Sequence, residues 1–582
     1  MTSDLAWQLD APDPVSVRDL AAALGLSELV ATLLINRDID SPDVARAFLA
    51  PLLTSLPDPF LMLDAERAAK RVADAVAADE AICVYGDYDV DGVTAAALMT
   101  SFLRALGHAP RVFLPDRFRD GYGLHEGRLM ELCDDGASLF ISVDCGSTAV
   151  SAVAAVRARN ADFIIVDHHQ LGPSLPDATA HLNPRRPGCG FKDEPLSAVG
   201  VALVLCQAIR RVLGHRGFFG NRPPPPMADL LELAALGTIA DMVPLRGMNR
   251  TLAWHGLRRL GHSQRPGVQA LARHSGVLEK CNNADQVGFL LGPRINAAGR
   301  VSDARLAFDL LTTTDAPHAD ALAVQIEIEN TRRKALQKEV EQAALLAAAD
   351  CPGRADAVVV ASAGWHGGVV GIVASRLKDT FDVPAFVLSI EDGVARGSGR
   401  SVYGYDLVEG LRAIDDGLFE RFGGHFFAAG VTLAADRVDD FARALAAHVA
   451  ATLPVSERIW PLRIDLELAI TDATLEVIDA IETLEPFGKG NRKPLFLLRG
   501  VEVADHRAVG DGSWIKARFV EQGDRPMWGR RGVDAFASRE VLGDLKKGDI
   551  IDVATRLERN VWRGNHSAQA SVIAVRAHTG PS

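Results

Sequence analysis

Carboxylate and imidazole side chains follow three apolar runs of the chain, at the point where each run ends. They are Asp87, Asp89 and Asp91 after residues 81–85, Asp144 after residues 139–143, and Asp167, His168 and His169 after residues 162–166. Short apolar runs predict buried strands, and in an open α/β sheet ligands bind at the carboxyl ends of the strands. Oxygen ligands combined with imidazole suit divalent cations. We therefore predict a site for two divalent metal ions.

The first acidic loop also matches the opening of an EF-hand calcium loop. Such a loop needs a bidentate glutamate at its twelfth position, and counting from Asp87 that position is Leu98. This excludes an EF-hand. A solvated turn would account for one acidic loop, but it does not explain why three strand ends carry the same chemistry.

The elements around these residues alternate between strand and helix from about residue 80 to residue 245. The pattern predicts a further strand at 111–114 and helices at 93–106, 124–133, 147–159 and 227–240, the last running into Asp241. Strands that alternate with helices form a mainly parallel sheet. The sequence therefore predicts an α/β domain whose functional groups gather along one edge of the sheet.

Three further segments follow. Residues 316–349 contain no Gly or Pro after Pro317 and carry apolar residues at helical spacing, which predicts one long helix joining two domains. A second α/β segment with glycine-rich loops has expected strands near 357–361 and 385–390. The last segment fits a small β-barrel of the OB type, with expected strands at 495–498, 515–519, 550–554 and 568–575.

These patterns divide the chain into five parts. They are a helical N-terminal extension (1–50), an α/β catalytic domain with a parallel sheet (51–315), a long connecting helix (316–350), a smaller α/β domain (351–455) and an OB-like nucleic-acid-binding domain (456–582).

Composition narrows the class of protein. The 582 residues are 48% hydrophobic and 24% charged, which is typical of soluble globular proteins. We expect no membrane association. No stretch of eighteen residues is apolar and free of charge, and the N-terminus lacks a secretory signal. The seven cysteines have neither metal-site nor disulfide spacing, which predicts free thiols in a reducing cytoplasm.

Charge is unevenly distributed along the chain. The net charge of −13 argues by itself against a nucleic-acid partner. Residues 481–582, however, hold 17 lysines and arginines against 13 aspartates and glutamates, a net charge of +4, interleaved with Phe519, Trp528 and Trp562. Basic groups with aromatic rings suit tracking and stacking along a single strand, although such aromatics can also fill a core.

An ordered series of motifs resembles the DHH phosphoesterase family, and within it the members that degrade single-stranded DNA. The series runs through residues 86–92 (GDYDVDG), 143–146 (VDCG), 167–169 (DHH), 182–184 (LNP), 235–245 (ALGTIADMVPL), 292–300 (GPRINAAGR), 365–376 (WHGGVVGIVASR), 397–401 (GSGRS), 423–430 (GGHFFAAG) and 486–491 (PFGKGN). One Asp-His-His tripeptide would be a weak signal, whereas ten motifs in order are specific. Residues after 491 match the family's barrel loosely.

The resemblance implies a ligand set for two ions, Mn²⁺ or Mg²⁺, with the nitrogen donor favouring Mn²⁺. Asp89 and Asp144 would bind one metal, and Asp91, Asp144, His168 and Asp241 the other, so that Asp144 bridges them. Two such ions lower the pKa of bound water and stabilise both moving oxygens of a phosphodiester. Tyr85 stands where some members have histidine, and Asp87 is a further ligand or hydrogen-bonds to one. Asp167 is expected to orient a ligand.

The resemblance also implies the residues that meet the substrate. Those at the scissile phosphate are His169, Arg300 and His366, and those that bind the strand are Arg117, Tyr122, Arg376, Ser398, Arg400, Gly424 and His425. Backbone N–H groups of glycine-rich loops at 397–401 and 423–425 could bind anions, unless the glycines only serve turns. His169 could instead be structural, Tyr122 could be a core tyrosine, and Trp365 could pack in the domain core.

The implied activity is degradation of single-stranded DNA from the 5′ end to 5′-mononucleotides, in DNA repair and recombination. Its expected partners are a helicase and a single-strand-binding protein, and we expect a monomer. One alternative is a related phosphodiesterase for short oligonucleotides or cyclic dinucleotides, but those enzymes are shorter and lack the barrel. Another is a non-catalytic DNA-binding relative, which would be expected to lose metal ligands, and this chain retains all of them.

Overall fold

The computed structural model describes residues 6–117, 119–191, 194–277, 282–455, 458, 461–523 and 530–580. The chain forms two compact units. We call Leu53–Arg458 the central unit, and Met1–Leu52 together with Ile459–Ser582 the terminal unit.

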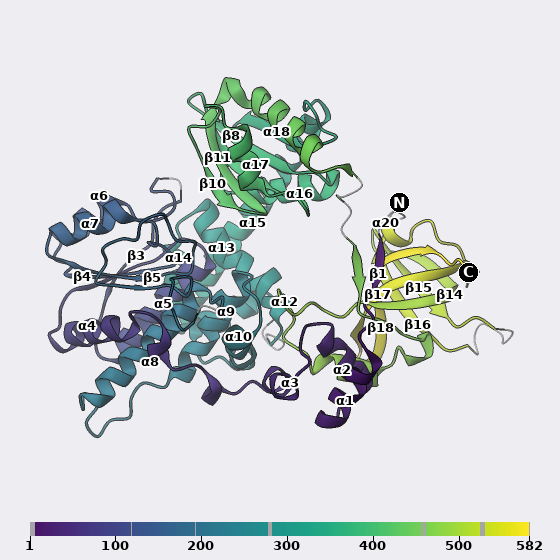
Figure 1. Cartoon of the computed structure of the whole chain (residues 1–582), viewed down its shortest axis with the longest axis horizontal. Coiled ribbons are helices and arrows are strands. Elements are labelled where there is room, and N and C mark those ends of the chain that lie inside the picture. The colour runs from purple at the N-terminus through teal and green to yellow at the C-terminus, as the bar shows by residue number, and fades with distance from the viewer. Residues whose placement is uncertain are drawn as a thin grey trace. The chain divides into compact units, whose positions relative to one another are not determined.

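The central unit begins with a five-stranded, all-parallel sheet, the first sheet (Figure 1). Its order is β3 (Arg111–Phe113), β2 (Ile82–Tyr85), β4 (Leu139–Val143), β5 (Asp162–Val166) and β6 (Ala180–Leu182). The apolar runs of β2 and β4 are fully buried, because helices cover both faces of the sheet. The prediction of a parallel α/β sheet is confirmed, and the carboxyl ends of β2, β4 and β5 lie side by side.

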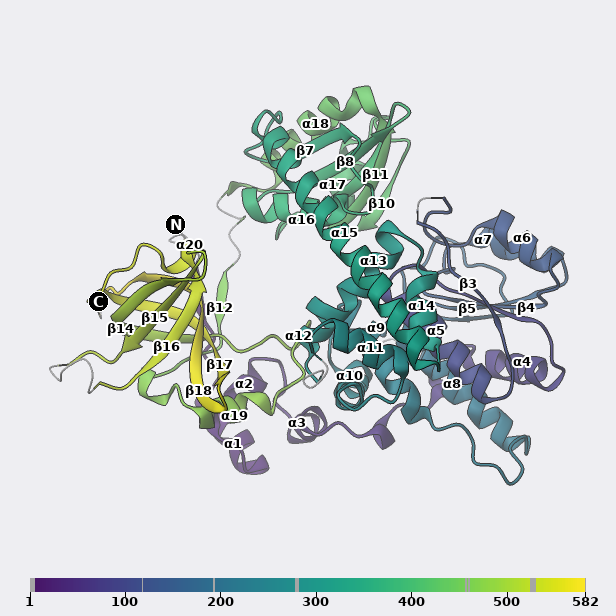
Figure 2. The same cartoon turned by 180° about the vertical axis from the view of Figure 1, so that it is seen from behind.

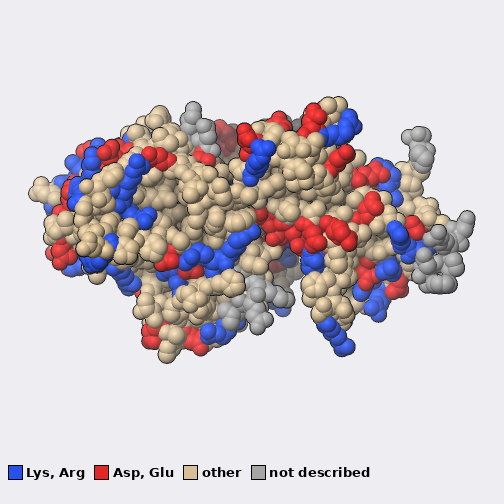
Figure 3. All heavy atoms as spheres, turned by 90° about the horizontal axis from the view of Figure 1, so that it is seen from below, with Lys and Arg blue, Asp and Glu red and all other residues tan. Residues whose placement is uncertain are grey.

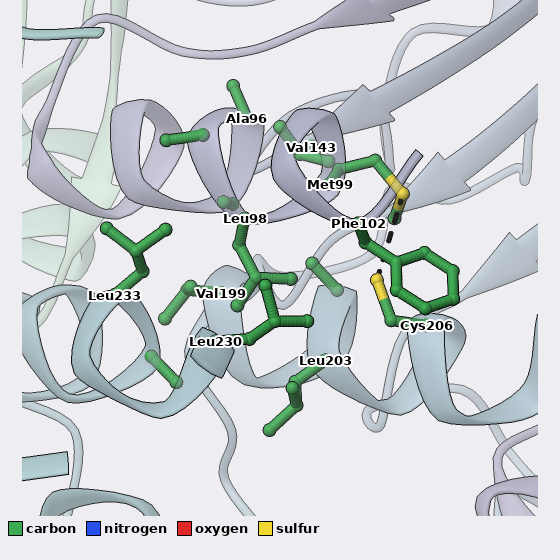
Figure 4. Close-up of a cluster of buried hydrophobic side chains, with 14 of the residues drawn as sticks. Ala96, Leu98, Met99, Phe102, Val143, Val199, Leu203, Cys206, Leu230 and Leu233 are labelled. Carbon is green, nitrogen blue, oxygen red and sulfur yellow. Dashed lines mark hydrogen bonds between the residues drawn. The ribbon is translucent and has the colours of Figure 1, made fainter. Parts of the chain in front are cut away.

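Helices pack on both faces of the first sheet. One face carries α4 (Ala65–Ala77), α5 (Val90–Ala105), α8 (Ala198–His215) and α9 (Leu231–Ala240), and the other carries α6 (Glu126–Asp134) and α7 (Val150–Ala158). In Figure 4, Met99 and Phe102 of α5 lie against Leu203 and Cys206 of α8, with Cys206 Sγ 3.9 Å from Met99 Sδ. This core holds α5, and therefore the acidic loop that precedes it, against the sheet.

We call the first sheet together with its helices the first α/β layer. The rest of this layer is helical and leads into a long helix. The elements are α10 (Gly247–Leu260), α11 (Pro266–His274), α12 (Ala284–Gln286), a π-helical turn at Val287–Leu291, α13 (Gly292–Val301) and α14 (Arg305–Thr312). The long helix α15 (Ala316–Ala349) crosses from this layer to the second α/β layer (Figure 2). Its 34 residues coincide with the predicted helix.

The second α/β layer is built on a mixed sheet, the second sheet. Its order is β10 (Arg421–His425), β11 (Ala428–Ala434), β9 (Val394–Arg400), β8 (Ala385–Glu391) and β7 (Val358–Ala363), with only β7 and β8 parallel. Helix α16 (Val370–Phe381) and the end of α15 cover one face, and α17 (Leu407–Ile414) and α18 (Val438–Thr452) cover the other.

The prediction of glycine-rich loops at 397–401 and 423–425 is largely wrong, because these glycines lie in β9 and β10. Strand β9 is paired on both sides and the edge strand β10 is paired with β11, so these glycines belong to a sheet and do not form an anion-binding loop. Glycine is required for packing: a Cβ on Gly397 would lie 2.0 Å from the carbonyl oxygen of Val387, and one on Gly399 2.4 Å from the Phe386 ring.

The terminal unit joins the two ends of the chain. Strand β1 (Trp7–Leu9) pairs in parallel with β12 (Leu462–Ile464). The helices α1 (Pro14–Leu24), α2 (Glu28–Ile35) and α3 (Pro42–Leu49) share one hydrophobic core with α19 (Leu475–Glu482) and the barrel. Within this core, Arg37 Nε donates to Asn491 Oδ1 at 2.9 Å, and the Arg37 guanidinium lies 3.3 Å from Asp465. The N-terminal helices are therefore part of the same body as the barrel.

The barrel closes because β14 (Phe496–Val509) pairs with both β15 (Trp514–Val520) and β17 (Ile550–Trp562). The remaining strands are β13 (Leu466–Glu467), β16 (Gly532–Ser538) and β18 (Asn565–Ala577), with α20 (Arg539–Leu542) after β16. This confirms an OB-like barrel. Phe519 is fully buried, so it fills the core, whereas Trp562 is exposed and Trp528 lies outside the described residues.

Three observations bear on the expectations from composition. Helix α8 is long and apolar enough to cross a membrane by length and composition alone, but 72% of it is buried inside the protein. All six described cysteines are free thiols, four of them buried. Figure 3 shows that lysine and arginine side chains gather in bands beside bands of acidic residues, so the net charge does not describe the local surface.

Candidate metal centre and phosphate-binding residues

The predicted metal ligands meet at the carboxyl edge of the first sheet. Ligand atoms of three overlapping groups lie within 4.8 Å of one another in each group: Asp87, Asp89 and Asp144; Asp91, His168 and Asp241; and Asp144, His168 and His169. We call these seven residues the acidic cluster. His168 Nε2 lies 3.3 Å from Asp144 Oδ1 and 3.8 Å from both Asp91 Oδ2 and Asp241 Oδ2. Asp144 therefore belongs to groups on both sides of the cluster.

Local backbone geometry aims these carboxylates. Asp89 caps α5 through Oδ1, which accepts from the backbone N–H of Asp91 at 2.9 Å and of Gly92 at 3.1 Å. Because of this cap the helix begins at Val90, three residues before the predicted start. A Cβ on Gly92 would lie 2.6 Å from the Asp87 carbonyl oxygen, so only glycine lets the loop fold this tightly.

Asp144 has a left-handed backbone, with φ of 66°. Such a conformation costs a non-glycine residue about 1–3 kcal/mol and persists where the surroundings enforce it. Here β4 ends at Val143, and the backbone N–H of Asp144 donates to the carbonyl of Val166 at 3.0 Å. The turn points the carboxylate into the cluster, where its exposed fraction is only 3%.

The cluster is electrostatically incomplete as a protein-only site. Burial first, and neighbouring carboxylates second, raise the pKa values of Asp87 and Asp144 well above the usual range and that of Asp91 to about 7. Among the described residues, buried Asp87 Oδ1, Asp144 Oδ1 and His168 Nε2 have no hydrogen-bond partner. Orphaned acceptors facing one another are what divalent cations would satisfy. The donor set therefore fits two oxygen-preferring ions.

Asp167 holds the Asp-His-His segment in place. Its Oδ1 accepts from the backbone N–H of His168 at 2.7 Å and from His169 Nδ1 at 2.8 Å, and its Oδ2 accepts from Ser147 N at 2.9 Å. Burial opposes a charge on His169, but the hydrogen bond and charge of Asp167 outweigh it and raise the pKa of His169 to about 9. Asp167 thus orients His169 and is no member of the metal-ligand groups.

Tyr85 has a structural contact that the sequence did not reveal. Its hydroxyl donates to the carbonyl of Gly123 at 3.2 Å and accepts from His125 N at 3.4 Å. Tyr85 thereby fixes the loop that carries Tyr122. The Tyr122 hydroxyl lies 3.2 Å from His169 Nδ1, while 48% of the residue is exposed. Tyr122 is therefore not a core tyrosine.

Arginines surround the cluster from several elements. Arg117 stacks on the Tyr88 ring, with its guanidinium carbon 4.2 Å from the ring centroid. Arg300 of α13 donates from Nη1 to the carbonyl of Gly368 at 3.2 Å. Burial, and then the charge of Arg117, lower the pKa of Arg300 to about 10, with smaller effects from Arg333 and Arg400. These arginines lie beside the carboxylates of the cluster, and their positive charge could pair with the phosphates of a nucleic acid.

Two residues that were predicted to lie in a phosphate-binding loop, Ser398 and Arg400, lie beside the start of α16. A Cβ on Gly371 would lie 3.2 Å from Arg400 Nη2 and 3.4 Å from Ser398 Oγ, so both side chains lie against the first turn of α16. The N-terminus of a helix of this length attracts anions through its unpaired N–H groups. Ser398 and Arg400 thus lie together with this helix end, and their donors could bind an anion.

Of the other predicted substrate residues, His366 and His425 carry imidazole rings, whereas Arg376 is held in an ion pair. His366 Nδ1 accepts from Gly368 N at 3.1 Å, which leaves Nε2 as the protonated nitrogen of a neutral ring. His425, next to Gly424 on β10, is exposed, and burial and then the charges of His169 and Arg185 lower its pKa. Arg376 instead pairs with Glu341 of α15 at 3.4 Å, and Trp365 packs in the core beneath α16.

Two residues next to the cluster were not singled out from the sequence. Asn183, fully buried, donates from Nδ2 to the carbonyl of His169 at 2.9 Å and to Ser147 Oγ at 2.8 Å. Arg185 donates from Nε to the carbonyl of His168 at 2.7 Å. The Asn-Pro dipeptide after β6 was the only signal that could have found them.

Comparison with known proteins identifies the family. The model of the DHH family, N-terminal domain, matches residues 81–238, that of the DHHA1 domain matches residues 355–451, and that of the RecJ OB domain matches residues 464–574. The single-stranded-DNA-specific exonuclease RecJ of Bacillus subtilis is 36% identical over 574 residues, which cover 98% of this chain and 71% of that protein.

Solved structures agree with the sequence matches. The crystal structure of RecJ in complex with Mn²⁺ from Thermus thermophilus superposes with a TM-score of 0.83 at 30% identity, covering 99% of this chain and 81% of that chain. The structure of RecJ with Mg²⁺ from the same organism gives a TM-score of 0.78 at 29% identity, covering 99% and 79%. Together with the domain order and the acidic cluster, these matches show that the chain belongs to the RecJ family of single-stranded-DNA-specific exonucleases.

Proposed function

We propose that this protein hydrolyses single-stranded DNA from the 5′ end and releases 5′-mononucleotides, in DNA repair and recombination. The observation that carries the proposal is the meeting, within one compact unit, of a carboxylate and imidazole cluster with a set of unpaired acceptors and the arginines beside it. The relative named single-stranded-DNA-specific exonuclease RecJ and the structures of RecJ with Mn²⁺ and with Mg²⁺ support the proposal.

The residues that would hold the two ions follow from the groupings in the cluster. Asp87, Asp89 and Asp144 would hold one ion, and Asp91, His168 and Asp241 the other, with Asp144 shared. When bound, such an ion pair supplies an activated water and neutralises charge on the phosphate. Asp167 and Asn183 would keep the histidines in position, because both bind the Asp-His-His backbone or ring.

Protein groups around the ions would act on the scissile phosphate directly. His169 has its Nδ1 engaged with Asp167, so Nε2 is the nitrogen that can meet a phosphate oxygen. His366 can donate from Nε2, and the Arg300 guanidinium can stabilise the extra negative charge of the transition state. Each of these contacts would strengthen as charge develops, which is the condition for lowering a barrier.

Recognition of the 5′ end would fall to the hydrogen-bond donors at the start of α16. A terminal phosphate carries more charge than an internal one, so Ser398, Arg400 and the helix end can distinguish the two. Arg117 would reach the same phosphate from the first α/β layer, and Tyr122 would stack on the terminal base. Gly424 and His425 would bound the strand on the opposite side, and Arg376 would contact it outside the cluster.

The barrel would bind the strand beyond the catalytic unit, through its +4 charge and exposed aromatics such as Trp514 and Trp562. A nuclease that requires single strands depends on another protein to open a duplex. We therefore further propose that this protein works as a monomer in the cytoplasm, together with a helicase and a single-strand-binding protein.

The test is an assay on two single-stranded oligonucleotides of the same sequence, labelled at either end, with Mn²⁺ or with EDTA. The expected result is early release of a labelled 5′-mononucleotide from the 5′-labelled strand and stepwise shortening of the 3′-labelled strand, only with metal. Stepwise shortening from the 3′ end would overturn the polarity. Cleavage of the same oligonucleotide at the same rate after annealing to its complement would overturn the specificity.

A further inference from the structure

Arg185 is an exposed arginine whose backbone is fixed by a turn. It follows β6 in the segment Asn183-Pro184-Arg185, where its backbone N–H donates to Asn183 Oδ1 at 2.9 Å. Asn183 is fully buried and bound to the His169 carbonyl. The turn is therefore anchored to the same backbone segment that carries the two histidines of the cluster.

The Arg185 side chain is tethered at one atom only. Nε donates to the carbonyl of His168 at 2.7 Å, and the residue is exposed. Among the described residues, no carboxylate lies within ion-pair distance of its guanidinium, although the cluster beside it is acidic. Because a guanidinium has five N–H donors, the tether leaves four of them for a ligand.

The surroundings of Arg185 differ from those of Arg117. Arg117 contacts the Tyr88 ring. Its charge partly offsets the rise that burial causes in the pKa of Asp87, and it adds to burial in lowering the pKa of Arg300. Arg185 contacts the His168 carbonyl, and its charge adds to burial in lowering the pKa of His425 on the second sheet. Arg117 follows β3 and Arg185 follows β6, the two edge strands of the first sheet, so the two arginines lie on different sides of the acidic cluster. A strand with its terminal phosphate at Arg117 and its scissile phosphate at the cluster would continue past Arg185.

We propose that Arg185 binds the first phosphate on the 3′ side of the scissile phosphate and thereby makes the enzyme favour substrates of three or more nucleotides. The inference rests on the proposed nuclease function and adds a subsite to it. A guanidinium held by a backbone carbonyl is pre-oriented, so little side-chain freedom is lost when it binds a phosphate. His425 bounds the same region from the second sheet, so a strand passing between them meets Arg185 on one side.

The experiment compares hydrolysis of 5′-phosphorylated thymidine oligonucleotides of two, three and twenty nucleotides by the full-length protein with Mn²⁺. The dinucleotide has no phosphate on the 3′ side of its scissile phosphate, whereas the other two do. We expect Arg185→Gln to raise KM about tenfold on the trinucleotide and the 20-mer with kcat nearly unchanged, and to leave the dinucleotide within about twofold. The matched control is Arg222→Gln, which removes the same charge from an exposed arginine of the loop after α8.

A second arm isolates the contact. A trinucleotide with a neutral methylphosphonate at its second internal linkage should be a poorer substrate for the wild type, and Arg185→Gln should add no further loss. Equal loss of kcat on all three lengths would overturn the proposal and mean that Arg185 only positions His168. No loss on any length, or a full additional loss on the methylphosphonate, would also overturn it. Failure of the wild type to release mononucleotides from every substrate would instead reject the proposed function.

Discussion

Arg300 and Gly368 connect the two α/β layers beside the acidic cluster. Arg300 Nη1 donates to the Gly368 carbonyl at 3.2 Å, and a Cβ on Gly368 would lie 2.1 Å from the Arg300 carbonyl oxygen. The first residue belongs to α13 and the second to the loop before α16. Two backbones that approach this closely set the distance between His366 on one side and the acidic cluster on the other.

The first prediction concerns this contact. Gly368→Ala should lower kcat about tenfold or more on short and long substrates alike, because the new Cβ must push the loop that carries His366 away from Arg300. Steady-state kinetics on a dinucleotide and a 20-mer would measure it. Gly127→Ala, a helical glycine with open space around its Cβ, is the matched control. Unchanged kcat in Gly368→Ala would show that the spacing is not needed.

The second prediction concerns the shared ligand. Asp144→Asn should reduce activity to about 1% or less at saturating Mn²⁺, because it removes a charge that both ions would share. Asparagine tolerates the left-handed backbone at this position, so the fold should survive. Without metal the variant should melt no lower than the wild type, since carboxylate repulsion falls. Asp177→Asn, an exposed carboxylate, serves as the control. Activity above a few per cent would contradict the two-ion assignment.

The third prediction concerns pH and metal removal. The pKa of Asp91 is raised to about 7, so in the metal-free protein the folded state holds a proton that the unfolded state loses near its ordinary value of 3.8. Stability from this group is therefore full below about pH 4 and lost as the pH rises through 7. Bound cations remove this penalty. The rise in Tm on adding Mn²⁺ should grow from pH 5 to pH 7.5.

Melting curves in EDTA and in Mn²⁺ across that pH range would test it. Asp91→Asn should flatten the part of the EDTA profile that this group causes, which separates it from other titrating groups. A Mn²⁺ effect that is constant or shrinks with rising pH would contradict the prediction.

The fourth prediction concerns the 5′ end. Arg400→Ala should slow cleavage of 5′-phosphorylated DNA roughly tenfold or more, because charge-assisted hydrogen bonds contribute about 1.5–3 kcal/mol each. It should affect 5′-hydroxyl DNA much less. Arg396→Ala is the matched control, since Arg396 is on the same strand and face of β9 but exposed. An unchanged ratio of the two rates in Arg400→Ala would mean that Arg400 does not bind the 5′ phosphate.

The fifth prediction concerns the terminal unit. A fragment of residues 53–458 should fold and cleave a dinucleotide within about threefold of the full chain, but bind a 30-mer at least about tenfold more weakly and with a smaller salt slope. Removing only residues 456–582 should give an insoluble protein, because α1–α3 lose the core they share with the barrel. Equal losses on the dinucleotide and the 30-mer would argue against a separate strand-binding unit.

The parts of the fold that sequence predicted well are those with a strong local pattern. The buried runs of β2, β4 and β5 and the unbroken helical spacing of α15 are visible residue by residue. Gly397 and Gly399 misled, because glycine marks turns and close packing alike, and only the Val387 carbonyl and the Phe386 ring show which applies. Strand β16 was missed because its alternation is carried by small residues.

The candidate site shows the same limit. The ligands could be named from strand ends and from family motifs, since each lies next to a recognisable pattern. Tyr85 and Arg185 could not, because their roles depend on a carbonyl oxygen, of Gly123 and of His168, that sequence does not mark. Ser398 and Arg400 were predicted to lie in a glycine-rich loop, but the structure places them on β9 against the first turn of α16, a neighbour that the sequence does not mark.

The shared core of the chain's two ends sets an order for folding during synthesis. The helices of the first 52 residues leave the ribosome first, yet their partners lie beyond residue 458, roughly 400 residues later. Contacts of such sequence separation form late, because a long loop must close before they can be made. The central unit can therefore reach its native state while α1–α3 still expose the apolar face that the barrel will bury. Chaperones should consequently bind mainly to the N-terminal segment of the nascent chain, until the barrel has folded.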